Sequence, residues 1–458
     1  MKRLLWFRRD LRVEDNRLLA LEGTVLPIFI FDPALLEPLE RDDRRVGMIL
    51  EGVLALKTAL RERGLELALF HGDPERVIAA LQARYGFDEV AASGDYDAHA
   101  RDRDLRVSHI LPFRFEHDTY IFRPDEVLKN DGTPYLVFTP FYKRAKTLFR
   151  RAHLEAVPPA PQRLLAFEYD GLHRIGGEGE ITVEPTLEAL GFVPSKTPHR
   201  LEPEACLEAF ETRISRYDER RDFPAEAATS ELGPELRFGT LGVRQLLRWL
   251  AERKKEGVDT EPFFRQLIFR DFYAYLLCHL PRLETENFRY PFSGEPDDAL
   301  FERFCRGETG VPMVDAGVRE LVETGKMHNR VRMVCASFLT KDLLLPWQWG
   351  ERFFARHLLD YDAASNALSW QWASGTGVDP QPYFRIFNPW KQGERFDRDG
   401  GYIRTWVPEL AEVEAKRLHD ERFFASGGVP GYPRPAVNHK AASQRAQAYY
   451  KTLLGRSS

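Results

Sequence analysis

The chain has 458 residues, 43% of them hydrophobic, and this composition excludes a wholly disordered protein. A chain of this length is expected to form two or three domains. Its formal net charge of -5 argues against a protein that coats nucleic acid over its whole surface, but it does not exclude a local basic patch.

No stretch of the sequence approaches the run of about 20 apolar residues that a membrane span requires. The first residues, MKRLLWFRRD, carry charges where a signal peptide has its apolar core. The four cysteines lie far apart and form no C-x-x-C pair. We therefore expect a soluble cytoplasmic protein with no membrane partner and no metal site.

Residues 1–125 predict a Rossmann-like α/β domain with a parallel sheet covered by helices. Short apolar runs typical of strands stand at 4–7, 25–31, 67–70 and 89–93. Apolar residues at helical spacing lie between them, at 43–63 and 74–85. This alternation is typical of a parallel sheet. RRDLRVEDN follows the first strand in place of a G-x-G-x-x-G fingerprint, so no conventional dinucleotide site is expected there.

Residues 126–200 predict an interdomain linker, because prolines and glycines gather there and periodicity is weak. From 201 to 458 strand-like alternation is absent, which predicts an all-α C-terminal domain. The expected helical stretches are 203–220, 240–255, 261–280, 313–325 and 329–345, with loops near 282–300 and 373–405.

Tryptophan gathers in the C-terminal half, where six of the eight lie within 60 residues: Trp347, Trp349, Trp370, Trp372, Trp390 and Trp406. Such clusters usually reflect core packing. Here polar residues accompany them, and Asn366 and Trp370 would share one helix face. A buried amide beside a large aromatic needs a partner, which a heteroaromatic ligand would supply.

Several segments, in order along nearly the whole chain, resemble the photolyase and cryptochrome family, and most of all its members that repair cyclobutane pyrimidine dimers. They are WFRRDLRVEDN (6–16), FIFDP (29–33), YLVFTPF (135–141), TSELGPELRFGTLG (229–242), RQLIFRDFYAYLL (265–277), TGKMHNRVRMVCASFLTKDLLLPW (324–347), 358–389 and YPRPAVNHKAA (432–442). The resemblance implies an antenna domain (1–125), a linker (126–200) and a helical FAD-binding catalytic domain (201–458). It also implies a deoxyribodipyrimidine photo-lyase, a monomer that acts on damaged DNA.

The resemblance also implies which residues hold FAD. Those matched to its phosphates are Tyr217, Thr229, Ser230, Glu231 and Leu232. Hydroxyls and N–H groups at a helix start suit a pyrophosphate, although Thr-Ser there is also an ordinary N-cap. Those matched to the ring and ribose are Arg270, Asn329, Arg332, Asp360, Asp362 and Asn366. Arg332 with Asp360 resembles an ion pair near the ring, where a positive charge favours the anionic reduced flavin.

Asn366 matches the family position that faces flavin N5. A neutral amide serves N5 as donor or acceptor without adding charge. Plant-type cryptochromes carry an acid at this position and insect ones a thiol, so Asn366 favours repair over sensing.

The dimer-binding set implied by the resemblance is Arg221, Gln266, Phe269, Asn329, Arg330, Met333 and Trp372. His328 stands without the second histidine of the relatives that repair (6-4) photoproducts, which favours a cyclobutane substrate. Gln266 and Phe269 depart from the glutamate and tryptophan usual in the family. Gln266 cannot give a proton and Phe269 stacks with less area, so we expect slower or weaker repair.

For photoreduction the resemblance implies a chain of oxidisable aromatics that begins with Trp370 and Trp347. The third family position is Phe304, which is harder to oxidise than tryptophan. The candidates for another exit are Trp349, Trp390 and Trp406, with Trp390 ahead because it follows the FRIFNP segment.

Three points stay open in the sequence. His99 and Ala100 stand where folate-binding relatives carry an Asn-Glu pair, so a second chromophore is possible but folate in the usual pose is not expected. The basic residues proposed to rim a DNA site are Arg221, Arg330, Lys341, Arg385 and Lys391. The alternative function is a cryptochrome-like blue-light receptor that binds FAD and signals through a partner, as Gln266, Phe269 and Phe304 would allow.

Overall fold

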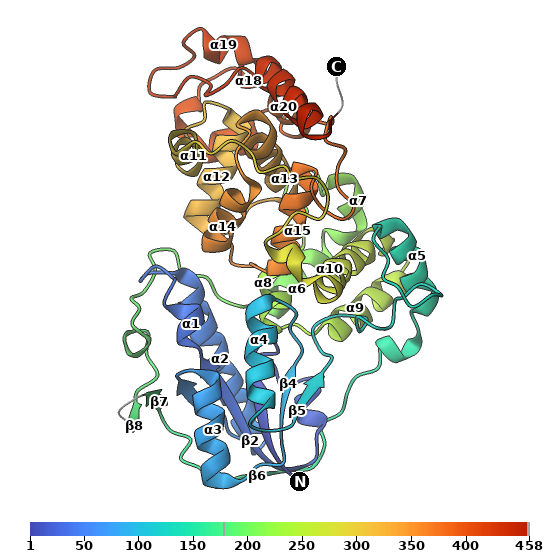
Figure 1. Cartoon of the computed structure of the whole chain (residues 1–458), viewed down its shortest axis with the longest axis vertical. Coiled ribbons are helices and arrows are strands. Elements are labelled where there is room, and N and C mark those ends of the chain that lie inside the picture. Colours follow the sequence, from blue (N-terminus) through green and yellow to red (C-terminus); the bar gives the residue numbers. More distant parts are fainter. Residues whose placement is uncertain (177–178, 456–458) are drawn as a thin grey trace. The chain divides into compact units, whose positions relative to one another are not determined.

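The computed structural model describes residues 1–176 and 179–455, and its contacts divide the chain into two compact units (Figure 1). Unit 1 comprises Met1–Gly132, Tyr142–Thr212 and Ser230–Cys278. Unit 2 comprises Thr133–Phe141, Arg213–Thr229 and His279–Ser458.

Unit 1 is built on one mostly parallel sheet with the strand order β5-β4-β1-β2-β3-β7-β8, and β6 pairs with β2. Its strands are β1 (Lys2–Phe7), β2 (Gly23–Phe31), β3 (Ala68–His71), β4 (Glu89–Ser93), β5 (Phe113–Glu116), β6 (Gln162–Leu164), β7 (Leu172–Gly176) and β8 (Gly179–Val183). The β7–β8 pair is antiparallel and the other pairs are parallel. The four strands that the sequence predicts are confirmed as β1 to β4.

Helices cover both faces of this sheet, which explains the continuous apolar runs of the strands. On β1, Leu5 and Phe7 pack in one cluster with the apolar stripe of α2 (Arg44–Glu62). Leu4 and Trp6 pack in another with residues of α3 (Pro74–Tyr85) and α4 (Ala98–Ser108). Successive strand residues point to opposite faces, so both sets are buried.

The segment predicted to be a linker is more regular than its sequence suggests. It contributes β6, β7 and β8 to the sheet, and it also contains the helix α5 (Phe138–Leu148). These strands have three to five residues, too few to show a period of two along the sequence. β6 and β7 form because β2 and β3 offer hydrogen-bonding partners that are distant in the chain, and β8 then pairs with β7.

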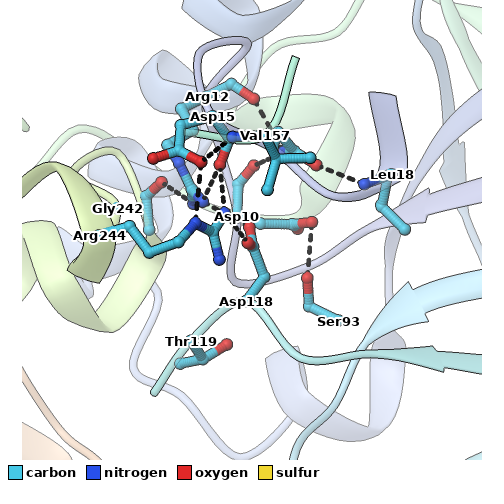
Figure 2. A network of polar contacts seen from close by, with 12 residues as sticks. Asp10, Arg12, Asp15, Leu18, Ser93, Asp118, Thr119, Val157, Gly242 and Arg244 are labelled. Atoms are coloured by element: carbon cyan, nitrogen blue, oxygen red, sulfur yellow. Dashed lines mark hydrogen bonds and ion pairs between the residues drawn. The ribbon is translucent and has the colours of Figure 1, made fainter. Parts of the chain in front are cut away.

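The loop after β1 is held by a buried charge network (Figure 2). Arg12 pairs with Asp118, and Arg244 bridges Asp118 Oδ1 at 2.6 Å and Asp15 Oδ1 at 2.8 Å. All four side chains are buried, and Asp15 also pairs through Oδ2 with Arg248 at 2.7 Å, so each buried charge has an opposite charge beside it. Arg244 lies on α9 (Val243–Lys255). These ion pairs therefore join the RRDLRVEDN loop to α9, which gives the motif a structural role within unit 1.

The remaining helices confirm the helical expectation beyond residue 201. Unit 1 holds α6 (Pro203–Glu211), α8 (Gly233–Phe238) and nearly all of α10 (Glu261–His279), besides the short α1 (Pro33–Leu36) that precedes α2. Unit 2 holds α7 (Tyr217–Arg220), α11 (Asp298–Cys305), α12 (Pro312–Thr324), α13 (Asn329–Ser337), α14 (Trp347–His357), α15 (Ala363–Ser374), α16 (Pro389–Phe396), α17 (Gly401–Trp406), α18 (Ala415–Leu418), α19 (Glu421–Ala425) and α20 (His439–Leu453).

Two details of unit 2 differ from the sequence-based expectation. The loop predicted at 373–405 is only partly irregular, because α16 and α17 form within it. The helix expected to run through 345 ends at Ser337 and continues as a π-helical turn, Phe338–Asp342. The core of unit 2 gathers side chains from Phe304 to Tyr432, including Trp347, Trp370 and Trp390.

Within residues 1–176 and 179–455, no helix is both long and apolar enough to cross a membrane. The same residues include no group of three His, Cys, Asp or Glu side chains placed to hold a metal ion.

Candidate functional site

His328 starts the helix that carries several candidate residues. It is the N-cap of α13, and its Nδ1 accepts a hydrogen bond from the backbone N–H of Arg330 at 3.1 Å. Burial lowers the pKa of His328 to about 4, so the ring is neutral and can accept. The cap fixes the first turn of α13, where Asn329 Nδ2 lies 3.7 Å from Met333 Sδ.

Arg332 and Asp360 form the ion pair that the family resemblance implies. Arg332 Nη2 lies 3.1 Å from each carboxylate oxygen of Asp360, and Arg332 Nε donates to the Met327 carbonyl at 2.8 Å. Among the described residues Arg332 Nη1 has no hydrogen-bond partner. The Arg332 side chain is 30% exposed and that of Asp360 25%, so the guanidinium of Arg332 remains accessible to a ligand as a fixed donor.

Asn366 is oriented by Glu351, a residue that the sequence analysis did not single out. Asn366 Nδ2 donates to the Glu351 carboxylate at 2.9 Å and to the Glu351 carbonyl at 3.0 Å. In the described part of the chain Asn366 Oδ1 has no partner. The buried amide therefore presents an acceptor. The two residues lie 15 positions apart on different helices, α14 and α15, so no local spacing in the sequence indicates their contact.

The two tryptophans expected to begin the photoreduction chain are fully buried in unit 2. Trp370 is 1% exposed and lies on α15, one turn after Asn366. Trp347 is 2% exposed and donates through Nε1 to Asn287 Oδ1 at 2.7 Å. A Cβ added at Gly350 would meet the Trp370 ring at 2.1 Å, so glycine is required for this close packing.

The possible exits differ in exposure. Phe304 is completely buried and Trp390 is 5% exposed, with its ring stacked on Phe424 at 5.7 Å. Trp349 is only partly buried and lies 5.1 Å from Phe301. Trp406 is also partly buried.

The candidate DNA residues of unit 2 are held by acidic and aromatic partners. Arg330 pairs with Asp222 at 2.9 Å and lies 4.3 Å above the Phe396 ring. Arg221 lies 3.5 Å from Asp218 and over the Tyr217 ring. Trp372 makes an edge contact with Phe387 at 6.4 Å.

Among the other basic residues, Arg385 and Lys391 are exposed. Lys341 is not: its side chain is fully buried, so the expectation that it rims a DNA site is wrong. The π-helical turn directs its ammonium group inward, to the Tyr383 carbonyl at 3.2 Å.

The α10 candidates belong to unit 1. Arg270 donates to the carbonyls of Thr119 at 2.7 Å and Leu236 at 3.0 Å, so its guanidinium is engaged by backbone within this unit. Gln266 makes one long contact, 3.4 Å, to the Pro262 carbonyl. Phe269 packs edge-on against Tyr273 at 5.0 Å.

The segment matched to the phosphates precedes a helix, as expected. Leu232 is the N-cap of α8, and its N–H lies 3.4 Å from Ser230 Oγ. Glu231 has a φ of 55°, an uncommon left-handed conformation for a residue with a side chain. Thr229 accepts from Arg213 at 3.5 Å through its carbonyl, and Asp362 caps α15.

The two antenna-region residues lie on α4. His99 Nε2 lies 3.1 Å from Asp32 Oδ2, a hydrogen bond that raises the pKa of His99. Ala100 is 2% exposed and offers no side-chain hydrogen bond. Nearby in sequence, Arg103 shares the Trp6 ring with Arg8, each guanidinium 4.9 Å from its centroid.

Two family models match the chain: "DNA photolyase" over residues 3–162 and "FAD binding domain of DNA photolyase" over residues 263–452. A deoxyribodipyrimidine photo-lyase of Halobacterium salinarum is 36% identical over 99% of this chain and 99% of its own length. The chain belongs to the photolyase/cryptochrome family. The Escherichia coli deoxyribodipyrimidine photo-lyase is 34% identical over 98% of both chains.

Solved structures of the family share the fold. A class III photolyase from Agrobacterium tumefaciens matches with a TM-score of 0.86 at 33% identity, covering 99% of this chain and 98% of its own. An archaeal photolyase from Sulfolobus tokodaii "with two FAD molecules" matches with a TM-score of 0.80 at 30% identity, over 99% and 100%. The predicted combination of an α/β domain and a helical FAD-binding domain is confirmed.

Proposed function

We propose that this protein is a photolyase that repairs cyclobutane pyrimidine dimers in DNA under light. The observation that carries the proposal is the full-length similarity to deoxyribodipyrimidine photo-lyases, with identities of 34% to 36%. When bound, reduced FAD supplies the electron that splits the dimer. The FAD-binding match spans residues 263–452, which include Arg332, Asp360 and Asn366.

The residues of unit 2 fit a flavin. Arg332 offers a fixed cationic donor, which stabilises negative charge on a ring beside it. Asn366 offers Oδ1 as an acceptor for an N–H group, because Glu351 engages its Nδ2. The proposed cofactor set remains Tyr217, Thr229, Ser230, Glu231, Leu232, Arg270, Asn329, Arg332, Asp360, Asp362 and Asn366. Of these, Arg270 is the weakest member, since two carbonyls already take its donors.

The substrate is a dimer flipped out of DNA, which aromatic walls and neutral polar groups would bind. We assign Arg221, Gln266, Phe269, Asn329, Arg330, Met333 and Trp372 to it. Arg385 and Lys391 add exposed positive charge for phosphates. Because contacts between these side chains and DNA phosphates release counterions, affinity for a dimer-containing duplex should fall steeply with salt concentration.

We propose that, in photoreduction, electrons reach the flavin through Trp370 and Trp347. For the exit of the positive charge, Trp390 contacts a further buried aromatic residue, Phe424, whereas Trp349 is partly exposed to solvent.

A second chromophore is also proposed for unit 1, since the Sulfolobus tokodaii photolyase holds two FAD molecules, with the implication of a novel light-harvesting cofactor in that protein. Folate in the pose anchored by an Asn-Glu pair does not fit His99, which Asp32 engages, or Ala100.

The second candidate function is a cryptochrome-like receptor, favoured by Gln266, Phe269 and Phe304. A repair assay separates the two. Purified protein, supplied with FAD and reduced, is illuminated with an oligonucleotide that carries one dimer. Light-dependent splitting supports repair, and binding of FAD without splitting supports the receptor.

The matched variants for this assay are Gln266→Glu and Phe269→Trp, which restore the usual family residues. We expect each to raise the rate of splitting or the affinity for the dimer. We also propose that the protein works as a monomer in the cytoplasm, and sedimentation of the FAD-loaded protein tests the first part.

A further inference from the structure

Tyr432 and Asp315 form a buried pair in unit 2 that the proposed repair reaction does not use. Tyr432 is 6% exposed and Asp315 is completely buried. The Tyr432 hydroxyl donates to Asp315 Oδ2 at 2.5 Å. A hydrogen bond from a neutral phenol to a buried carboxylate is short and strong.

The Asp315 carboxylate is held in place by three further donors. Its Oδ1 accepts from the Thr309 N–H at 2.8 Å and the Thr309 hydroxyl at 2.6 Å, and its Oδ2 accepts from the Gly310 N–H at 2.9 Å. Burial raises the pKa of Asp315 despite these bonds, which makes it a better base than an exposed aspartate. Burial raises the pKa of Tyr432 far above its usual value, so the phenol keeps its proton at rest.

An aromatic path joins this pair to a tryptophan. The Tyr432 ring contacts Phe424 edge-on at 5.4 Å, and Phe424 stacks on Trp390 at 5.7 Å with an interplanar angle of 27°. All three rings belong to the buried core of unit 2. Phe424 is therefore the single side chain between the Tyr432 and Trp390 rings along this path.

We propose that Tyr432 is a proton-coupled electron donor that reduces oxidised Trp390, with Asp315 as the proton acceptor. The inference rests on the proposed function in one respect, since Trp390 must lose an electron when flavin is photoreduced. It goes beyond that function by placing the final oxidised site on a buried tyrosine.

The step balances within the protein. One electron passes from Tyr432 to the Trp390 radical cation, and the phenolic proton moves along the existing hydrogen bond to Asp315 Oδ2. Trp390 returns to its neutral form, Tyr432 becomes a neutral radical and Asp315 becomes a neutral carboxylic acid. The proton must move because an uncompensated charge on a buried tyrosine would be strongly unfavourable.

The chain supplies a matched control that involves the same helix. Tyr402 is 3% exposed and donates to Glu320, which lies on α12 five residues after Asp315. Among the described residues, the ring contacts of Phe424 include Trp390 and Tyr432 but not Tyr402. Tyr402→Phe thus removes a buried tyrosine–carboxylate bond without touching the path.

The experiment follows radicals by EPR after a flash on the FAD-loaded, oxidised protein. We expect a neutral tyrosyl signal in the wild type, its loss in Tyr432→Phe with a longer-lived tryptophan radical, and its retention in Tyr402→Phe. In the wild type itself, D₂O should slow formation of the signal. A tyrosyl signal that survives in Tyr432→Phe, or no tyrosyl signal beside a clear tryptophan radical, would overturn the inference and leave the repair proposal standing.

Trp390→Phe separates the two levels of the argument. Loss of both the tryptophan and tyrosine signals places Trp390 upstream, as proposed. Unchanged signals would overturn the Trp390 exit and this inference together, whereas dimer splitting in the repair assay tests the repair function independently.

Discussion

Asn366 and Glu351 are joined by two hydrogen bonds, from one amide nitrogen to the carboxylate at 2.9 Å and to the main-chain carbonyl at 3.0 Å. This fixes which end of the amide is left for a ligand. Burial raises the pKa of the Glu351 carboxyl, and the hydrogen bonds from Asn366 and Tyr361 oppose that rise. The pair links α14 to α15 and therefore sets the orientation of Asn366.

Replacing Glu351 with alanine should remove the carboxylate acceptor of the Asn366 amide and leave only its bond to the main-chain carbonyl. We expect a loss of about 1–3 kcal/mol in stability and a shifted midpoint potential of the bound flavin, because a buried donor loses an acceptor. Glu351→Gln keeps an acceptor oxygen and should stay close to the wild type. Potentiometric titration and thermal unfolding of the three proteins give the measurement, and equal potentials in all three would contradict the assignment.

Phe304→Trp should restore a readily oxidised tryptophan at the third position of the usual family chain. Flavin photoreduction is expected to become faster, since tryptophan is more easily oxidised than phenylalanine. Because Phe304 is completely buried, the larger ring should also lower stability by about 1–3 kcal/mol. Photoreduction under constant light measures the first effect. Phe115→Trp, at an exposed position on β5 in unit 1, tests whether any added tryptophan has the same result.

Gly350→Ala should displace Trp370. The new Cβ would stand 2.1 Å from the indole ring, which is rigid and 1% exposed. We expect destabilisation by about 1–3 kcal/mol or more and slower flavin photoreduction. Near-UV circular dichroism and thermal unfolding follow the change. Gly47→Ala, inside helix α2 with its nearest atom at 3.9 Å, separates this clash from the general effect of adding a methyl group to a helix.

Lys341 should make stability depend on pH. Burial lowers its pKa from 10.5 to about 7, so between these values the unfolded chain binds the proton and the folded chain does not. The free energy of unfolding should then rise with pH across this window, by about 1.4 kcal/mol for each unit of pKa difference. Below pH 7 this contribution is lost.

Denaturant unfolding from pH 6 to pH 10 checks the Lys341 prediction. Lys341→Met should flatten the rise relative to the wild type, and Lys391→Met, at an exposed position, should leave it unchanged. Parallel curves for the wild type and Lys341→Met would show that Lys341 is charged inside the folded protein.

Much of the fold could be predicted from local sequence. β1 to β4 are recognisable as short continuous apolar runs, and the apolar stripes of α2 and α3 recur at helical spacing. The short strands β6 and β7 carry no such pattern, because they form by pairing with β2 and β3. The π-helical turn was likewise invisible, since its sequence, FLTKD, reads as an ordinary helix continuation.

The sequence by itself determined the family, the order of the domains and the residue types at the candidate site, because motifs and their order along the chain can be recognised without knowing any contact in space. Only the tertiary structure decided what each side chain touches. It buried Lys341, engaged Arg270 with two carbonyls and turned Asn366 toward Glu351. It also joined Tyr432 to Asp315 across 117 positions. Such contacts depend on the packing of distant segments, which no local pattern encodes.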